Sequence, residues 1–219
     1  FPYPYLYTQH YTNIMTALTE KITAGAAARE HWKKILLPEK VTIADYNERC
    51  ASNFQLCGDI VLDDAPQRQT TLTVLIDPSN SSRWKRETEH IYAIVRNGEI
   101  MKLGGTRTGM KKRWDSYKCG HCVPQRLQKR TGEPFPGKMS VTNAHLYHTI
   151  EDSLLKGDQW QFWSWELPEH TFSVQMPTGV SVQIATQTYH AYESWSMNEF
   201  KDMAGHIPQL CNNSDPNYR

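Results

Sequence analysis

One tight turn constrains the fold of this chain more than any other feature. Asn97 and Gly98 stand between two short apolar runs, IYAIV before the pair and EIMKL after it. An Asn-Gly pair accepts the positive φ angles of a type I′ turn, which joins two antiparallel strands through two residues. The sequence therefore predicts a β-hairpin over residues 90 to 106.

The rest of the chain places this hairpin in an α+β pattern. Helical spacing of apolar residues predicts a mostly helical segment over residues 1 to about 50 and later helices at 140–157 and roughly 190–205. Short apolar or alternating runs predict further strands at 59–63, 71–76 and 160–167, and a second hairpin at 171–186. The predicted fold is a small antiparallel sheet flanked by helices, with a helical N-terminal arm and an inserted β-hairpin.

Positive charge is concentrated directly after the first predicted hairpin. The chain carries a net charge of only +1, yet residues 102 to 130 hold nine basic residues and one acid, Asp115. The nine are Lys102, Arg107, Lys111, Lys112, Arg113, Lys118, Arg126, Lys129 and Arg130. Such a block is typical of a phosphate-binding surface. The charge alone also fits an alternative, in which the basic block is a solvated loop that binds no phosphate.

Composition argues against membrane and disulfide-stabilised classes. No apolar run approaches the roughly 18 residues that a membrane helix needs, and we find no signal-peptide pattern. Five cysteines, an odd number with uneven spacing, favour a reducing compartment. We therefore expect a cytoplasmic protein without a membrane partner.

Two of the cysteines have the spacing of half a zinc site. Cys119 and Cys122 form a Cys-x₂-Cys pair, and Cys50 with Cys57 would complete a tetrahedral sulfur set. The sequence between Cys50 and Cys57 has no other feature of a zinc motif. The sequence favours a reduced pair in a DNA-contacting loop over a structural Zn²⁺ ion.

The first hairpin and the residues after it resemble the GIY-YIG nuclease superfamily. That family carries Gly-Ile-Tyr on one strand, Tyr-Ile-Gly on the next, an arginine on the following helix, and a glutamate on a later helix before a Pro and an Asn. Here the motifs read His90-Ile91-Tyr92 and Lys102-Leu103-Gly104, followed by Arg113 in MKKRW, then Glu199, Pro208 and Asn212.

Two departures from the family pattern matter. His90 replaces a structural glycine, and Lys102 replaces a tyrosine that family members treat as catalytic. A lysine at this position is similar to a few restriction endonucleases, which points to the type II restriction branch and to a prokaryotic or phage origin. The resemblance covers residues 88–213 as a nuclease core with insertions. It leaves 1–87 as an N-terminal arm with strands for dimerisation or DNA contacts, and 214–219 as a tail.

The resemblance implies a separate role for each of these residues in phosphodiester hydrolysis. Tyr92 would activate water, and a cation at Lys102 would favour its phenolate form. Opposed side chains of an antiparallel pair lie about 5 Å apart, which is close enough for this effect. Arg113 would hold the phosphate through its fork of donors. Glu199 would bind one Mg²⁺ ion, which keeps most of its waters.

The carboxylate assignment has two alternatives. Glu193, six residues earlier, is the other candidate metal ligand. Ser196 and Glu199 also match a capping box, which would give the glutamate a role at a helix start instead. We place Glu199 in the site because Trp195 and Met203 lie four residues to either side and predict a partly buried helix face.

The predicted function is a Mg²⁺-dependent DNA endonuclease, most like a type II restriction enzyme that cuts double-stranded DNA. Cutting both strands requires two sites, so a homodimer is expected. The N-terminal arm and the second hairpin are candidates for dimerisation or base reading. A phage, repair or homing endonuclease and a non-catalytic nucleic-acid-binding protein are the alternatives. The predicted DNA contacts are Arg107, Lys111, Lys112, Arg126, Lys129 and Arg130.

Overall fold

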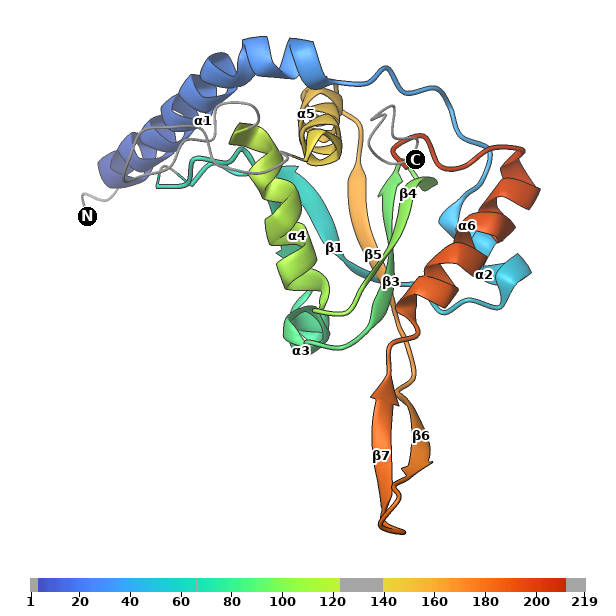
Figure 1. Cartoon of the computed structure of the whole chain (residues 1–219). Coiled ribbons are helices and arrows are strands. Elements are labelled where there is room, and N and C mark those ends of the chain that lie inside the picture. Colours follow the sequence, from blue (N-terminus) through green and yellow to red (C-terminus); the bar gives the residue numbers. More distant parts are fainter. Residues whose placement is uncertain (1–3, 66, 123–139, 212–219) are drawn as a thin grey trace.

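The computed structural model describes residues 4–65, 67–122 and 140–211 (Figure 1). It confirms the predicted α+β class. The described helices are α1 (Pro4–Trp32), α2 (Ile43–Cys50), α3 (Ser81–Lys85), α4 (Met110–Lys118), α5 (Val141–Leu155) and α6 (Tyr189–Ala204), with 3₁₀ turns at Pro78–Asn80 and Cys119–Cys122. The described strands are β1 (Gln55–Leu62), β2 (Leu72–Ile76), β3 (His90–Arg96), β4 (Glu99–Thr106), β5 (Trp160–Glu166), β6 (His170–Gln175) and β7 (Ser181–Thr186).

Five of these strands form one antiparallel sheet in the order β2-β1-β5-β3-β4. Strand β5, late in the chain, lies between β1 and β3 and pairs with both. The strands of the predicted N-terminal segment therefore share a sheet with those of the predicted nuclease core. The division at residue 87 stays a prediction about function. Strand β4 is an edge of the sheet.

The Asn-Gly pair turns the chain as predicted. Asn97 has a φ of 50° and Gly98 a φ of 87°, the positive values that a type I′ turn requires. The register that follows pairs Tyr92 with Gly104 and Ile94 with Lys102, and a bulge follows Ile94. Tyr92 and Lys102 therefore point to the same face of the sheet, one rung apart.

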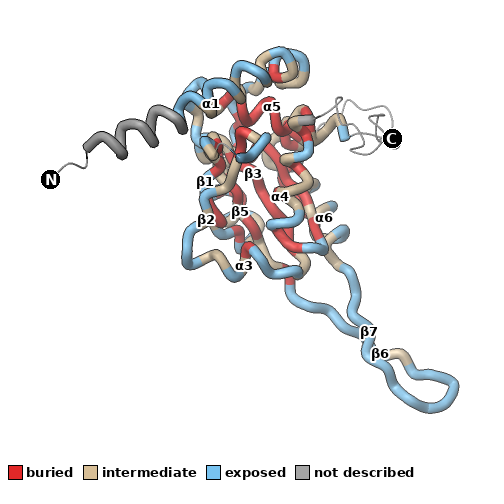
Figure 2. The backbone as a smooth tube through the Cα atoms, turned by 90° about the vertical axis from the view of Figure 1, so that its left-hand side faces the viewer, coloured by how far each residue is buried: buried red, intermediate tan, exposed pale blue. Residues whose placement is uncertain are grey.

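Alternation along β3 divides the core between the two faces of the sheet. Tyr92 and Ile94 belong to one buried cluster, with side chains of α4 and α5. Ile91 and Val95 belong to a second cluster, with side chains of α2 and α6. Each face thus has its own helical layer, and Figure 2 shows the buried backbone between them.

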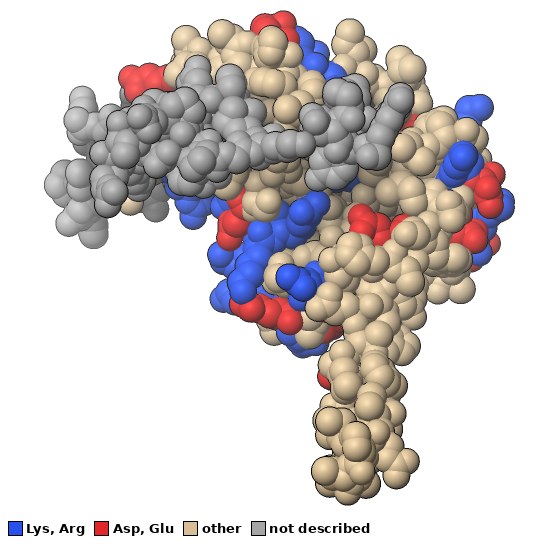
Figure 3. All heavy atoms as spheres, in the orientation of Figure 1, with Lys and Arg blue, Asp and Glu red and all other residues tan. Residues whose placement is uncertain are grey.

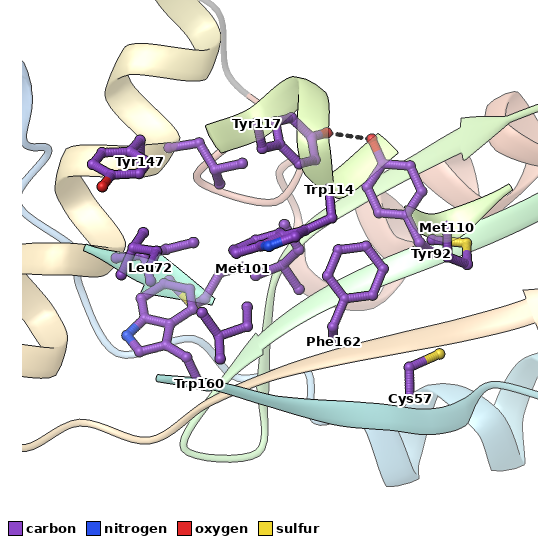
Figure 4. Close-up of a cluster of buried hydrophobic side chains, with 14 of the residues drawn as sticks. Cys57, Leu72, Tyr92, Met101, Met110, Trp114, Tyr117, Tyr147, Trp160 and Phe162 are labelled. Atoms are coloured by element: carbon purple, nitrogen blue, oxygen red, sulfur yellow. Dashed lines mark hydrogen bonds between the residues drawn. The ribbon is translucent and has the colours of Figure 1, made fainter. Parts of the chain in front are cut away.

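Aromatic rings fill the first cluster (Figure 4). Tyr92 stacks on Phe162 with ring centroids 5.7 Å apart, and Trp114 meets Phe162 edge-on at 5.9 Å. Trp84 also meets Phe162 edge-on. This packing fixes the ring of Tyr92 against the sheet and fixes α4 above it.

The N-terminal arm is attached to the core through α5. Arg29 of α1 pairs with Glu151 of α5 at 3.1 Å, and both side chains are buried. Thr71, just before β2, donates its hydroxyl to the same carboxylate. The arm therefore crosses one end of the sheet, as Figure 1 shows.

The second predicted hairpin, β6 with β7, is confirmed and projects from the opposite end of the molecule (Figures 1 and 2). It leaves the sheet after β5 and returns into α6. Helix α6 ends at Gly205, whose φ of 81° is the left-handed conformation common at helix C-termini. No described helix combines the length and apolar character needed to cross a membrane.

Candidate active site

Three side chains form a hydrogen-bonded group on the α4 face of the sheet. The Tyr92 and Tyr117 hydroxyls bond to each other. Arg113 donates from Nε to the Tyr92 oxygen and from Nη2 to the Tyr117 oxygen, both at 3.0 Å. The guanidinium also lies over both rings, 4.6 Å from the centroid of Tyr117. The structure thus brings two predicted residues, Tyr92 and Arg113, into contact.

Burial determines the protonation of this group. It raises the pKa of Tyr92 well above the ordinary value near 10, and the neighbouring Tyr117 raises it further. Arg113 and Lys102 both act in the lowering direction, but they do not outweigh burial. Burial also raises the pKa of Tyr117 to about 12. Lys102 thus favours the phenolate in direction, as expected, but burial has the larger effect, and at neutral pH Tyr92 holds its proton.

Lys102 lies beside Tyr92 but not opposite it. Its partner across the hairpin is Ile94, whereas Tyr92 faces Gly104. A diagonal neighbour in an antiparallel pair lies about 7–8 Å away instead of about 5 Å. Lys102 is 7% exposed, and its ammonium donates to the carbonyl oxygen of Leu210 at 3.2 Å.

Strand β4 has two glycines, Gly104 and Gly105, at the point where neighbouring side chains approach its backbone closely from both faces. A Cβ on Gly104 would lie 2.2 Å from the Tyr92 hydroxyl oxygen. A Cβ on Gly105 would lie 2.7 Å from the ring of Tyr189 and 3.0 Å from a carboxylate oxygen of Glu193. Gly104 makes room for Tyr92 on one face, and Gly105 lets α6 approach on the other.

A cavity of about 340 Å³ opens at this edge of the sheet. Because no described strand lies beyond β4, side chains from both faces reach the same space. Its wall combines residues of β3, β4, α4, α5 and α6. The lining residues are Tyr92, Lys102, Leu103, Arg113, Ser116, Ser140, Thr142, Asn143, Glu193, Met197 and Cys211.

Of the two candidate metal ligands, Glu193 lies on the cavity wall and Glu199 does not. Residues six apart on a helix differ by about 240° in direction at 3.6 residues per turn, so α6 cannot present both to one cavity. Met197, one turn after Glu193, shares its face. Glu199 faces α2 instead, where the Cys50 thiol approaches its carboxylate at 4.0 Å. We therefore move the assignment from Glu199 to Glu193.

The capping-box alternative for Glu199 is not met either. Helix α6 begins at Tyr189, so Ser196 and Glu199 lie in its middle. Ser196 is fully buried, and its backbone carbonyl accepts a hydrogen bond from Tyr46 at 2.9 Å. The Ser-x-x-Glu spacing here reflects packing of α6 on α2.

The donor set in the cavity fits a hard divalent cation held by few protein ligands. Among the described residues, no three His, Cys, Asp or Glu side chains gather as a metal cage would require. Glu193 is one carboxylate with 34% of its side chain exposed. Mg²⁺ commonly binds through one or two carboxylates, several waters and the phosphates of the substrate. Glu193 suits that mode.

The described cysteines do not form the zinc site considered above. Cys57 is buried in the cluster on the α4 face and contacts the Ser164 hydroxyl at 3.0 Å. Cys50 packs against the cluster on the opposite face of the sheet. Cys119 is exposed at the end of α4. The sheet thus separates Cys50 from Cys57.

A basic surface lies next to the cavity. Lys111 and Lys112 are exposed on α4, and Arg107 is exposed just before it, so Lys and Arg side chains gather over this helix (Figure 3). Lys111 pairs with Asp115 at 2.8 Å and Lys112 with Glu87 at 2.6 Å. The other predicted DNA contacts, Arg126, Lys129 and Arg130, lie outside the described residues.

Tyr117 is the main site residue that the sequence analysis did not identify. It shares a hydrogen bond with Tyr92 and accepts another from Arg113. The sequence does contain a signal for Tyr117, which is its spacing from Arg113, because residues four apart on a helix lie on one face. Tyr117 follows Arg113 by four positions, so placing Arg113 in the site places Tyr117 there also.

The solved structures to which this chain is similar include the following two. One is restriction endonuclease HPY188I in complex with product DNA, with a TM-score of 0.45, 20% identity, and coverage of 82% of this chain and 94% of that chain. The other is a mutant of bacteriophage T4 EndoII, with a TM-score of 0.46, 19% identity, and coverage of 76% of this chain and 97% of that chain. No protein-family model matches the chain, and no curated protein matches it. At this level of similarity we draw no functional conclusion from either structure.

Proposed function

We propose that this protein is a Mg²⁺-dependent endonuclease that hydrolyses phosphodiester bonds in double-stranded DNA. One observation carries the proposal. Lys102 and Arg113 face a single cavity, and neither forms an ion pair with any carboxylate of the described residues. Lysine is rarely buried without a compensating anion. A bound phosphate would supply the missing negative charge.

Arg113 suits the phosphate of a transition state. Its Nε and one Nη2 hydrogen are used by the tyrosine hydroxyls, which lock the plane of the guanidinium. The remaining donors of the fork have no acceptor among the described residues and are available to phosphate oxygens. Lys102 adds a second positive charge in a nearly dry setting, where electrostatic stabilisation is strong.

Tyr92 is the residue that we assign to proton transfer. A phenolate at Tyr92 would accept hydrogen bonds from Arg113 and from the Tyr117 hydroxyl, so the pair can share one negative charge. That phenolate would then accept a proton from the attacking water. Because burial raises the pKa of Tyr92, the phenolate is a minor form at neutral pH, and its fraction increases with pH.

Glu193 is the residue that we assign to the metal ion. When bound, a divalent ion supplies positive charge that offsets the charge developing on the phosphate oxygens. A cavity wall that combines this one carboxylate with Lys102 and Arg113 favours a one-metal site. Clustered acids of the kind that hold two ions are absent from the described part of the chain.

The exposed lysines of α4 favour DNA over a small phosphodiester as the substrate. Lys111 and Lys112 lie outside the cavity, where a long polyanion can reach them. Contacts of this kind bind phosphates without regard to sequence. Within the endonucleases we favour a type II restriction enzyme acting as a homodimer, because one cavity cuts one strand and twofold symmetry would supply the second.

Incubation of the purified protein with supercoiled plasmid tests the proposal. With Mg²⁺ we expect a discrete set of linear fragments, and with EDTA we expect intact plasmid. Random nicking in Mg²⁺ would retain the nuclease and remove the restriction assignment. Plasmid that is bound but left intact with Mg²⁺, Mn²⁺ or Co²⁺ would overturn the enzymatic proposal.

A further inference from the structure

The β6–β7 hairpin has two chemically different faces. Register pairs Phe172 with Ile184 and Val174 with Val182, so one face of the ribbon is apolar. The rungs between and beside them form the other face. These rungs are Thr171 with Ala185, Ser173 with Gln183, and Gln175 with Ser181. Five of the six side chains on that second face are neutral hydrogen-bonding groups, and the sixth is Ala185.

The hairpin carries no charged side chain along its length. From residue 170 to residue 188 the sequence contains no Lys, Arg, Asp or Glu. Figure 3 shows the hairpin as an uncharged projection beyond the basic surface over α4. The five polar residues of its neutral face are all exposed: Thr171, Ser173, Gln175, Ser181 and Gln183. An exposed arm that avoids all charge is not built to bind phosphates.

The base of the ribbon contacts α6 and the segment that precedes α4. His170, on the apolar side, stacks on Tyr192 of α6 with ring centroids 6.4 Å apart. Ala185, on the neutral face, lines a cavity of about 390 Å³ together with Arg107 and Glu87. Arg107 also contacts Gln187 at 3.5 Å. The base of the neutral face thus lies beside the loop that leads into α4.

We propose that the neutral face of this hairpin reads base edges in the major groove of the DNA. The inference rests on the proposed endonuclease function and adds the surface that selects the sequence. DNA bound over α4 would have its phosphates held by lysine and its groove met by the hairpin. Charge would thus bind the backbone, and neutral donors and acceptors would select the bases.

The dimensions and chemistry of the ribbon fit this role. The major groove is about 12 Å wide and admits a two-stranded β-ribbon. Rungs on one face of a strand repeat every 6.6 Å or so, close to two base-pair steps of about 3.4 Å each. Glutamine pairs with adenine through N6 and N7, and serine or threonine hydroxyls bond to several bases.

Selection of bound sequences from a random DNA duplex library, in Ca²⁺ to separate binding from cleavage, tests the inference. We expect the wild-type protein to enrich a defined motif. The double variant Gln175→Ala/Gln183→Ala should lose part of that motif, with affinity for the wild-type site falling about tenfold or more for each glutamine that contacts an adenine. Its affinity for unrelated DNA should stay the same, because no phosphate contact is removed.

Matched variants make the result specific to the neutral face. Gln69→Ala, at an exposed glutamine far from the hairpin, should enrich the wild-type motif. Gln183→Glu keeps the side-chain shape but only accepts hydrogen bonds, so it should change the preferred base at one position. An unchanged motif in the double variant, or no motif in the wild type, would overturn base reading by the hairpin. Plasmid cleavage is measured separately, so failure here leaves the endonuclease proposal standing.

Discussion

The absence of a side chain at Gly104 is what allows the Tyr92 hydroxyl to occupy its position. A Cβ at Gly104 would lie 2.2 Å from that oxygen and 2.5 Å from the ring carbon that carries it. The two residues face each other across the hairpin. The glycine of the second motif therefore has a local steric role, which is to let Tyr92 extend over β4 toward the cavity edge.

Gly104→Ala should accordingly impair cleavage more than it impairs folding. The Tyr92 ring must shift to relieve the overlap, at about 1–3 kcal/mol of stability, and a displacement near 1 Å costs about 10²-fold in rate. Gly25→Ala, within α1, is the matched control, because its Cβ would make only ordinary contacts, at 3.9 Å, with the carboxylate oxygens of Glu151. That change should stabilise the protein by up to about 1 kcal/mol. Single-turnover cleavage and thermal melting of both variants check the prediction.

Glu193→Gln should abolish Mg²⁺-dependent cleavage and leave DNA binding intact. The substitution removes the carboxylate on the cavity wall but keeps Lys102 and Arg113. Glu199→Gln is the control on the same helix, and it should cut at nearly the wild-type rate because Glu199 faces Cys50. Cleavage rates and duplex affinity are measured for both. A dead Glu199→Gln beside an active Glu193→Gln would reverse the assignment.

The β3–β4 hairpin and the helices that flank the sheet could be predicted from local sequence patterns. Asn97 and Gly98 determine their turn through backbone preference alone, and the turn fixes the strands beside it. The end of α6 at Gly205 and the turn containing Gly179 depend on the same local chemistry. These features need no knowledge of distant residues.

The arrangement of the site could not be predicted in the same way. Without a bulge, the register set by the turn would place Lys102 opposite Ala93. The bulge after Ile94 shifts the register by one residue, so Lys102 faces Ile94 and lies on the same face of the sheet as Tyr92. Choosing Glu193 over Glu199 requires the rotation of α6 about its axis, which depends on how α6 packs against α2 and β4. The protonation of Tyr92 depends on burial by side chains from other elements of the fold. Each of these is a property of tertiary packing.

His90 should make stability depend on pH. Burial lowers its pKa to about 4, against 6.5 for an exposed histidine. The unfolded chain therefore binds more protons between these values, so stability is full above pH 6.5 and falls as pH drops toward 4. The maximum loss is about 3 kcal/mol at 1.36 kcal/mol per pKa unit.

His90→Gln should lose this part of the pH dependence. Chemical denaturation of both proteins between pH 4 and pH 7.5 gives the difference in unfolding free energy. Carboxylates titrate in both proteins, so the difference isolates the histidine. Parallel stability curves for the two proteins across this range would show that His90 is not held neutral.

Tyr92→Phe and Tyr117→Phe separate proton transfer from packing, since each removes one hydroxyl from the same hydrogen-bonded pair. Either change leaves a buried partner less well satisfied, so both should lower stability by a similar amount, about 1–3 kcal/mol. Only Tyr92 is assigned to the chemistry, so Tyr92→Phe should slow cleavage by about 10² or more, and Tyr117→Phe should slow it much less.

The pH profile tests the chemical role directly. The phenolate of Tyr92 forms above the ordinary range, so the wild-type rate should rise with pH from 7 to 9. The residual rate of Tyr92→Phe should lose that rise, whereas Tyr117→Phe should keep it. Single-turnover rates on saturating duplex, beside the melting temperature of each variant, provide the measurement. Equal rates and equal profiles for the two variants would mean that Tyr92 acts only by packing, and the proton would then have to be accepted by another group in the cavity.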